Sequence, residues 1–338
     1  MPVTDSTGAD WERATGPSPA VGRSQVHALL ERGGYQDART GIAESFLTPT
    51  VGGARTVALV SRPLGEPDGM GWVVCHSFGM EQIFTQELEA MTARAFAERG
   101  HVVLQFHAQG YGDSELPTEH ASLRSQLGDT LDAVGLLREM DGVREVGLIG
   151  ARLGGSIAAQ AADVSGAAGL VLWNPVIDGG RYLEQVFRQA TATDLARGDR
   201  SEDDGWSPMQ VLRETGVVDL AGFALSRELA EEIGAIRLLD RPWRFHPRAL
   251  LLQISSTPEP RPDHSELVSA FERAGADVSF DTVVQPEARW FGMVSRYGAS
   301  KSGRRVDKQA SLSDAIVEAT TRWAGSPDQP IRDQDTGR

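Results

Sequence analysis

Short apolar runs alternate with helical patterns along most of the chain. Two runs at 41–49 and 55–63 flank the turn sequence VGGA and predict an antiparallel hairpin. Further near-continuous apolar runs lie at 71–78, 101–108, 145–151, 169–176, 249–255 and 277–284. Amphipathic helical patterns separate most of these runs. Strands buried on both faces are apolar throughout, so the pattern predicts an α/β fold with a mostly parallel sheet of about eight strands.

The alternation is interrupted at 179–246, where helical patterns occur without a convincing strand. We therefore expect a helical cap inserted after the sixth strand, with the core formed by 23–178 and 247–325. Such a cap would lie over the carboxyl ends of the strands, where open α/β sheets bind ligands. The ends, 1–22 and 326–338, are rich in polar and turn-forming residues and are predicted to be disordered tails.

Composition narrows the possible partners and locations. The chain has 338 residues and a formal net charge of −14, which argues against binding to nucleic acid or to an anionic membrane surface. A single cysteine, Cys75, excludes an intramolecular disulfide. The sequence contains no signal-peptide pattern and no run of 18 apolar residues, so we expect a cytoplasmic protein.

Three short motifs follow three of the predicted strands. They are CHSFGME (75–81), GYGDSE (110–115) and GARLG (150–154). In this order and context they resemble the oxyanion-hole loop, the Gly-x-Gly-x-Ser turn and the nucleophile elbow of the α/β-hydrolase superfamily. The resemblance implies an α/β-hydrolase fold with a cap. The elbow of that superfamily reads Gly-x-Ser-x-Gly, and Arg152 stands here in place of the serine.

A closer resemblance is to the exosortase A system-associated hydrolase 2 group, whose elbow reads Gly-Leu-Arg-Leu-Gly. The matching segments are GARLG, GYGDS, WNPVIDGGRYLEQVFRQ (173–189), the cap segment 218–233 and the aromatic pair in RWF (289–291). The likeness covers roughly residues 70–295, and the sequence departs from the group at its oxyanion loop. Because the group is named for its gene neighbourhood in polysaccharide clusters, the resemblance implies a biosynthetic setting rather than hydrolysis.

A Ser-His-Asp triad cannot be assembled from the expected positions. A hydrolase of this fold needs its histidine after the last strand, but the last histidine in the chain, His264, precedes that strand. Arg289 or Trp290 occupies the place where the histidine would lie. The acid loop offers Glu259 or Asp263. With the nucleophile and the base both missing, ordinary esterase chemistry is not expected.

Arg152 has two interpretations. It could pair with an acidic residue and hold the turn, and Asp178 at the end of the sixth strand is a candidate partner. Alternatively it could bind an anion, because the elbow lies at a helix N-terminus that already favours negative charge. A guanidinium adds a fork of donors suited to carboxylate or phosphate. Either way, a buried arginine needs a partner.

Other residues near the motifs are candidates for the site. His76 is a general base or a structural histidine, and Ser77 is a displaced nucleophile only if a histidine reaches it. Glu81 is a catalytic carboxylate or the acid that starts the next helix, and Cys75 is a buried hydrophobe unless its pKa is lowered. The expected ligand-lining residues are Phe78, His107, Leu153, Asp178, Arg289 and Trp290. No motif indicates a metal, and GYGDSE lacks the third glycine of a nicotinamide or flavin site, so no cofactor is expected.

Three functional hypotheses follow from these observations. The leading one is a triad-less α/β-hydrolase-fold protein that binds an anionic small molecule under the cap, without hydrolysis or with non-standard chemistry. The second is an acyl ester or thioester hydrolase with a relocated nucleophile. The third is a pseudoenzyme scaffold that binds a protein partner or a second copy of the chain through the cap.

Overall fold

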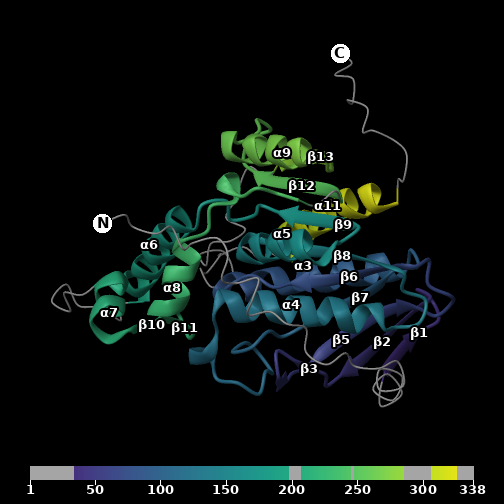
Figure 1. The fold of residues 1–338 in the computed structure, drawn as a ribbon, viewed down its shortest axis with the longest axis horizontal. Helices are drawn as coiled ribbons and strands as arrows, with labels where there is room; N and C mark the ends of the chain where they lie inside the picture. The colour runs from purple at the N-terminus through teal and green to yellow at the C-terminus, as the bar shows by residue number, and fades with distance from the viewer. Residues whose placement is uncertain (1–33, 198–206, 245–246, 285–305, 326–338) are drawn as a thin grey trace, which may run out of the picture.

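The computed structural model describes residues 34–197, 207–244, 247–284 and 306–325. Within them, one sheet of nine strands runs in the order β1-β2-β5-β7-β6-β8-β9-β12-β13 (Figure 1). The strands are β1 (Gly34–Asp37), β2 (Ile42–Leu47), β5 (Ala58–Pro63), β6 (Met70–Cys75), β7 (Val102–Phe106), β8 (Glu145–Ala151), β9 (Gly169–Trp173), β12 (Arg248–Ser255) and β13 (Asp277–Val284). The pairs from β7 to β13 are parallel, and the pairs from β1 to β7 are antiparallel.

The predicted sheet is confirmed, with two additions on its antiparallel side. The hairpin expected at 41–63 is formed by β2 and β5, and a smaller pair, β3 (Thr50–Val51) and β4 (Ala54–Arg55), extends its turn. The ninth strand, β1, was not expected. It is a four-residue edge strand, GYQD, with three exposed positions, so no apolar periodicity distinguishes it from a loop.

Helices cover both faces of the sheet, as the apolar strands require. They are α3 (Met80–Ala97), α4 (Leu123–Arg138), α5 (Arg152–Ser165), α9 (Pro262–Ala274) and α11 (Val306–Ala324), with a short 3₁₀ turn at Thr118–His120. Alternate residues of β6 enter two cores: Val73 packs with α4, α5 and α9, whereas Trp72 packs with α3 and α11. None of the helices in these described ranges combines the length and apolar character needed to cross a membrane.

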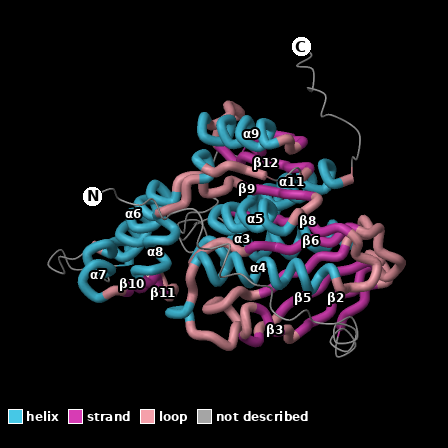
Figure 2. Tube along the Cα trace, viewed as in Figure 1, coloured by secondary structure: helices cyan, strands magenta, loops and turns pink. Residues whose placement is uncertain are grey.

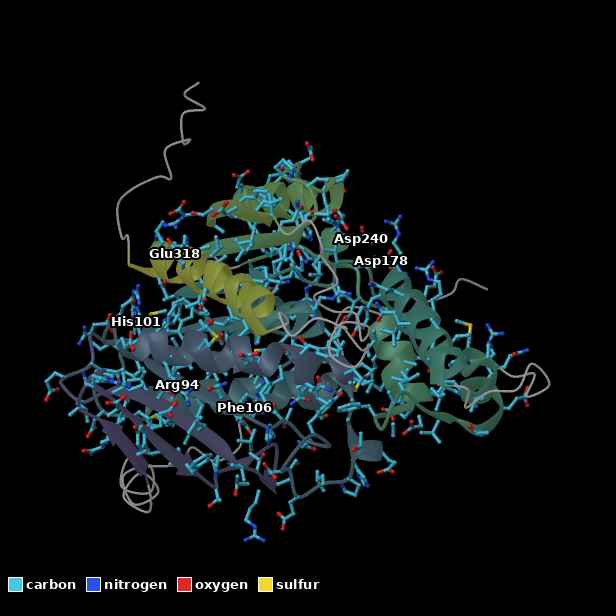
Figure 3. All side chains as sticks on the ribbon, turned by 180° about the vertical axis from the view of Figure 1, so that it is seen from behind. Arg94, His101, Phe106, Asp178, Asp240 and Glu318 are labelled. Atoms are coloured by element: carbon cyan, nitrogen blue, oxygen red, sulfur yellow. The ribbon has the colours of Figure 1, made fainter. Side chains whose placement is uncertain are left out.

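The segment after β9 forms a separate group of short elements beside the sheet. It contains α6 (Gly179–Arg197), α7 (Pro208–Thr215), β10 (Val217–Asp219), β11 (Ala224–Ser226), α8 (Arg227–Gly234) and a 3₁₀ turn at Leu238–Asp240. Figure 2 shows this group as mostly helical. In Figure 3, Asp240 of this group and Asp178 just before it lie far from His101. The expectation of helices alone was wrong for β10 and β11, which at three residues each are too short for alternation to reveal.

The turn between β8 and α5 is constrained by close backbone approach. A Cβ on Gly154 would overlap the carbonyl oxygens of Cys75 and His76 at the end of β6. A Cβ on Gly150 would overlap the backbone of Gly154 itself. Both glycines of the GARLG motif are therefore required by packing, whatever side chain stands between them.

We predict that Gly154→Ala destabilises the protein by about 3 kcal/mol or more, because the obstructing atoms belong to rigid backbone. Gly128→Ala is the matched control, since Gly128 also lies inside a helix and nothing lies within 4 Å of its added Cβ. That change should be neutral or stabilise the fold by about 0.5–1 kcal/mol. Chemical denaturation of both variants measures the difference, and equal stability would contradict the packing argument.

Candidate functional site

Arg152 lies at the point where β8 becomes α5, and its backbone adopts a left-handed conformation with φ of 52°. Such a conformation is costly for a residue with a side chain and persists only where the surroundings impose it. Here Arg152 lies between Gly150 and Gly154, where the backbone is packed too closely for a Cβ at either glycine. A strained strand-to-helix turn is therefore present, and the side chain at this turn is the Arg152 guanidinium.

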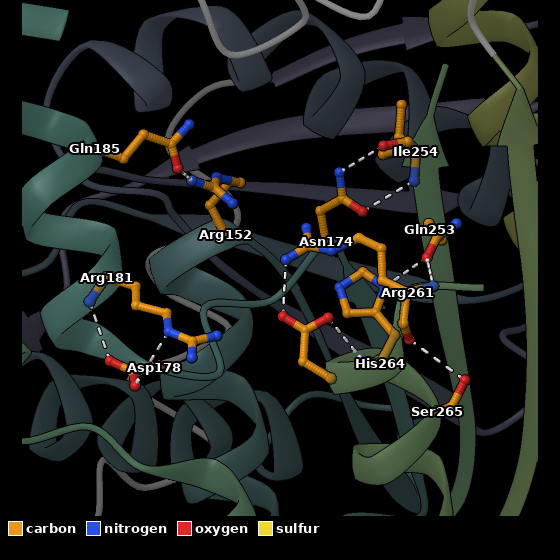
Figure 4. Close-up of polar contacts among 11 residues, drawn as sticks. Arg152, Asn174, Asp178, Arg181, Gln185, Gln253, Ile254, Arg261, His264 and Ser265 are labelled. Carbon is orange, nitrogen blue, oxygen red and sulfur yellow. Dashed lines mark hydrogen bonds and ion pairs between the residues drawn. The ribbon is translucent and has the colours of Figure 1, made fainter. Parts of the chain in front are cut away.

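The Arg152 side chain is held by protein groups from two other helices. Its Nε donates a hydrogen bond of 3.0 Å to Oε1 of Glu81, in the first turn of α3. Its Nη2 donates to Oε1 of Gln185 in α6 at 3.2 Å (Figure 4). The guanidinium carbon lies 5.3 Å from the ring centre of Tyr182, whose hydroxyl donates to Oε2 of Glu81 at 2.9 Å. We call Arg152, Glu81, Tyr182 and Gln185 the elbow network.

The elbow network is buried and its charges compensate one another. The side chains of Arg152 and Glu81 are only 10% and 8% exposed. Burial alone would lower the pKa of Arg152, but the Glu81 carboxylate more than offsets this, so the pKa is raised. Burial and the same carboxylate raise the pKa of Tyr182 well above its usual value. The arginine therefore stays charged, and the tyrosine stays a hydrogen-bond donor.

The expected pairing of Asp178 with Arg152 was wrong. Asp178 precedes α6, and its Oδ1 accepts the backbone N–H of Arg181 at 3.0 Å. Its carboxylate lies 3.4 Å from Nη1 of Arg237, which is in the cap. Figure 4 shows Asp178 beside Arg181, apart from the Arg152 guanidinium. The residue serves the start of its own helix, where a carboxylate meets unpaired N–H groups.

His76 is held between two acceptors. Its Nδ1 lies 2.6 Å from Oε2 of Glu89, whose other oxygen accepts from Thr85 at 2.8 Å. Burial would lower the pKa of His76, but Glu89 and a hydrogen bond to the Phe106 carbonyl raise it above the usual value. Both neighbouring acceptors favour the protonated ring, and neither ring nitrogen faces the Ser77 hydroxyl, which donates to another residue.

The two neighbouring nucleophile candidates are buried. Ser77 is 2% exposed, and its hydroxyl donates to the carbonyl of Ala151 at 2.9 Å. No histidine in the described ranges is hydrogen-bonded to this hydroxyl. Cys75 is 3% exposed, and burial raises the pKa of its thiol to about 12. A thiol with that pKa is almost wholly protonated near neutral pH.

The remaining predicted ligand-lining residues take structural positions or lie elsewhere. His107 accepts the backbone N–H of Asp113 at 3.0 Å through Nδ1, and burial together with His76 lowers its pKa. Phe78 packs edge-on against Tyr111 with ring centres 6.4 Å apart, and Leu153 is fully buried. Arg289 and Trp290, with the tails at 1–22 and 326–338, lie outside the described residues.

A second polar cluster lies at the ends of β9 and β12. Asn174, with φ of 44°, exchanges two 2.9 Å hydrogen bonds with the backbone of Ile254 (Figure 4). His264 is fully buried, with Nδ1 lying 3.1 Å from Oε1 of Gln253. Its Nε2 has no hydrogen-bond partner among the residues that the structure describes. Burial and Arg261 lower the pKa of His264 to about 4, so it is neutral near pH 7.

Sequence reasoning missed the partners that complete the site. Tyr182 and Gln185 are three residues apart in one helix and so share a face, which is a signal available from the sequence. Nothing in the sequence assigns that face to Arg152 rather than to the cap interior. Glu89 follows Thr85 by four residues on α3, but its pairing with His76 depends on how that helix lies over the sheet.

Comparison with known proteins identifies the fold. No family model and no curated protein matches the chain. Among solved structures it is similar to Est1E from Butyrivibrio proteoclasticus with ferulic acid bound (15% identity, 81% of this chain, 97% of that chain, TM-score 0.51). It is also similar to the α/β hydrolase GrgF from Penicillium sp. sh18 (16%, 83%, 97%, 0.52) and to brefeldin A esterase, a bacterial homologue of human hormone-sensitive lipase (16%, 96%, 87%, 0.52). The chain has an α/β-hydrolase fold.

We predict that Arg152→Ala destabilises the protein by about 3 kcal/mol, because it leaves the buried Glu81 carboxylate without its counter-charge. Arg181→Ala is the control, since that side chain is 83% exposed in its ion pair with Asp178 and should contribute less than about 1 kcal/mol. Urea denaturation measures both effects. A loss for Arg152→Ala no larger than for the control would show that Glu81 does not depend on the arginine.

His264 should make the free energy of unfolding depend on pH in the acidic range. Its folded-state pKa of about 4 lies below the usual 6.5, so the unfolded chain binds more protons between these values. Stability therefore falls as the pH drops from about 6.5 to 4, by up to about 3 kcal/mol. In His264→Gln this part of the pH dependence should vanish, whereas His120→Gln on the surface should keep it. Parallel curves for wild type and His264→Gln would contradict the assignment.

Proposed function

We propose that this protein is a non-hydrolytic member of the α/β-hydrolase fold. In it, Arg152 and Glu81 form an ion pair within the core, hydrogen bonds to Tyr182 and Gln185 join this pair to the cap, and the protein acts by binding rather than by cleavage. The observation that carries the proposal is the elbow network. The side chain at the nucleophile position is fully engaged in holding α3, α5 and α6 together.

The rest of the expected catalytic set supports the same conclusion. The sequence has no histidine after His264, so no histidine base follows β13. His76 lies against Glu89 and the Phe106 carbonyl, and the Ser77 hydroxyl donates a hydrogen bond to the Ala151 carbonyl. A relocated nucleophile would need an exposed, activated hydroxyl or thiol. The buried Ser77 and the Cys75 thiol with its raised pKa do not meet that requirement.

The anion site at Arg152 is the weaker alternative. An anionic ligand would add a second negative charge beside Glu81, which already neutralises the guanidinium at 3.0 Å. Like charges at that distance oppose each other strongly in a buried setting. A protein-binding or ligand-binding role that leaves the elbow network intact avoids this conflict.

Further contacts between cap and core favour a rigid binding surface over a lid that opens for substrate. Glu232 of α8 accepts the backbone N–H of Leu123 at the start of α4, at 2.5 Å. Arg241 lies 3.6 Å from Asp163 and donates to Gln160, both in α5. The likeness to exosortase A system-associated hydrolase 2 proteins, which share an arginine in the elbow, extends the proposal to a role in a cytoplasmic biosynthetic cluster.

The first test asks whether any nucleophile is active. We expect no labelling of the folded protein by a fluorophosphonate probe and no turnover of p-nitrophenyl acetate above the buffer rate. Iodoacetamide should label Cys75 only after unfolding. Labelling of wild type that is lost in Ser77→Ala or Cys75→Ala would overturn the proposal in favour of a relocated nucleophile.

The second test distinguishes a structural role of Arg152 from anion binding by Arg152. Thermal unfolding is followed for wild type and Arg152→Ala with phosphate, acetate and an acyl thioester, against chloride at equal ionic strength. We expect no anion-specific stabilisation of either protein. A shift of several degrees in wild type that disappears in the variant would favour ligand binding at Arg152, because about 2.7 kcal/mol is gained at 100 times the dissociation constant.

A further inference from the structure

A small cavity lies behind the loop that follows β6, on the side of α4 and α5. Its volume is about 20 Å³, which is room for one water-sized group. Its walls include Cys75 and His76 from the loop, Phe106 at the end of β7, Tyr111, and Gln126 and Thr130 of α4. Arg152 is not among the lining residues, so the cavity is separate from the elbow network.

Two polar atoms in this cavity wall have no partner. The Tyr111 hydroxyl and the Gln126 amide nitrogen are both buried without a hydrogen bond among the described residues. Tyr111 is 7% exposed and Gln126 is 6% exposed. Burial raises the pKa of Tyr111 and the Gln126 side chain lowers it in part, so the two groups lie near each other. Buried donors of this kind are nearly always satisfied in folded proteins.

The cavity is electrically neutral. Burial keeps the Tyr111 hydroxyl and the Cys75 thiol protonated. His76 is paired with Glu89 at 2.6 Å, so this carboxylate already has a partner. The Thr130 hydroxyl already donates a hydrogen bond to the backbone carbonyl of Gln126 at 2.8 Å. A charged ligand would therefore lose its hydration without gaining a counter-ion, whereas a neutral acceptor would gain two hydrogen bonds.

We propose that this cavity is a binding site for one neutral oxygen atom, which accepts hydrogen bonds from the Tyr111 hydroxyl and the Gln126 amide. The oxygen belongs to a water molecule or to the end of a small neutral carbonyl compound. The site lies beyond the binding role proposed above and does not depend on it. Its ligand is neutral, in contrast to an anion held by Arg152.

The test has a crystallographic arm for water and a solution arm for the organic ligand. A high-resolution crystal structure should contain one density peak within hydrogen-bonding distance of both Tyr111 Oη and Gln126 Nε2. The peak should be lost in Tyr111→Phe, which keeps the ring packed against Phe78. Gln126→Met, which removes the amide but keeps the length of the side chain, is the second variant.

In solution, methyl NMR of Ile157, which lines the cavity, follows a titration with formamide and with formate of the same size. A saturable shift with formamide that is lost in Tyr111→Phe identifies a neutral carbonyl compound as the occupant. We expect little shift with formate and no change at the distant Ile316. A density peak without a formamide shift identifies water as the occupant and supports the site. A direct Tyr111–Gln126 hydrogen bond without a peak, or a formate shift as large as that of formamide, overturns the proposal.

Discussion

The buried ion pair between Arg152 and Glu81 determines which polar groups remain available at the carboxyl end of β8. A guanidinium cannot be buried alone, so the arginine at the elbow requires a carboxylate, and Glu81 at the start of α3 supplies it at 3.0 Å. The remaining oxygen of Glu81 takes the Tyr182 hydroxyl, which joins α6 to the same pair. The turn between β8 and α5 is therefore occupied by contacts between core and cap.

The geometry of the turn between β8 and α5 is explained by packing rather than by catalysis. Gly150 and Gly154 let α5 approach the end of β6 so closely that no Cβ fits at either position. Arg152, between these two glycines, has a left-handed backbone with φ of 52°. A Gly-x-x-x-Gly elbow is therefore evidence for the fold, and the chemistry must be argued from the central residue and its partners.

Much of the fold could be predicted because long apolar strands and amphipathic helices carry strong periodic signals. The arginine between the two glycines of GARLG and the lack of a histidine after His264 could be read from the sequence directly. The partner of Arg152 could not: Glu81 is 71 residues away, and its distance depends on how α3 leaves the sheet. Asp178, close to the end of β9 in the sequence, was the candidate partner, but its carboxylate accepts a backbone N–H at the start of α6. The Tyr111–Gln126 cavity likewise depends on side-chain orientation, which periodicity does not encode.

A double-mutant cycle on Arg152→Met and Glu81→Gln tests the central claim most directly. Each single change leaves a buried polar partner unsatisfied, whereas the double variant removes both charges together. If Arg152 and Glu81 form one interdependent buried charge pair, the double variant should be more stable than the sum of the single losses predicts, with a coupling energy of about 2 kcal/mol or more. Additive losses, with coupling near zero, would mean that Arg152 and Glu81 act independently and would contradict the account.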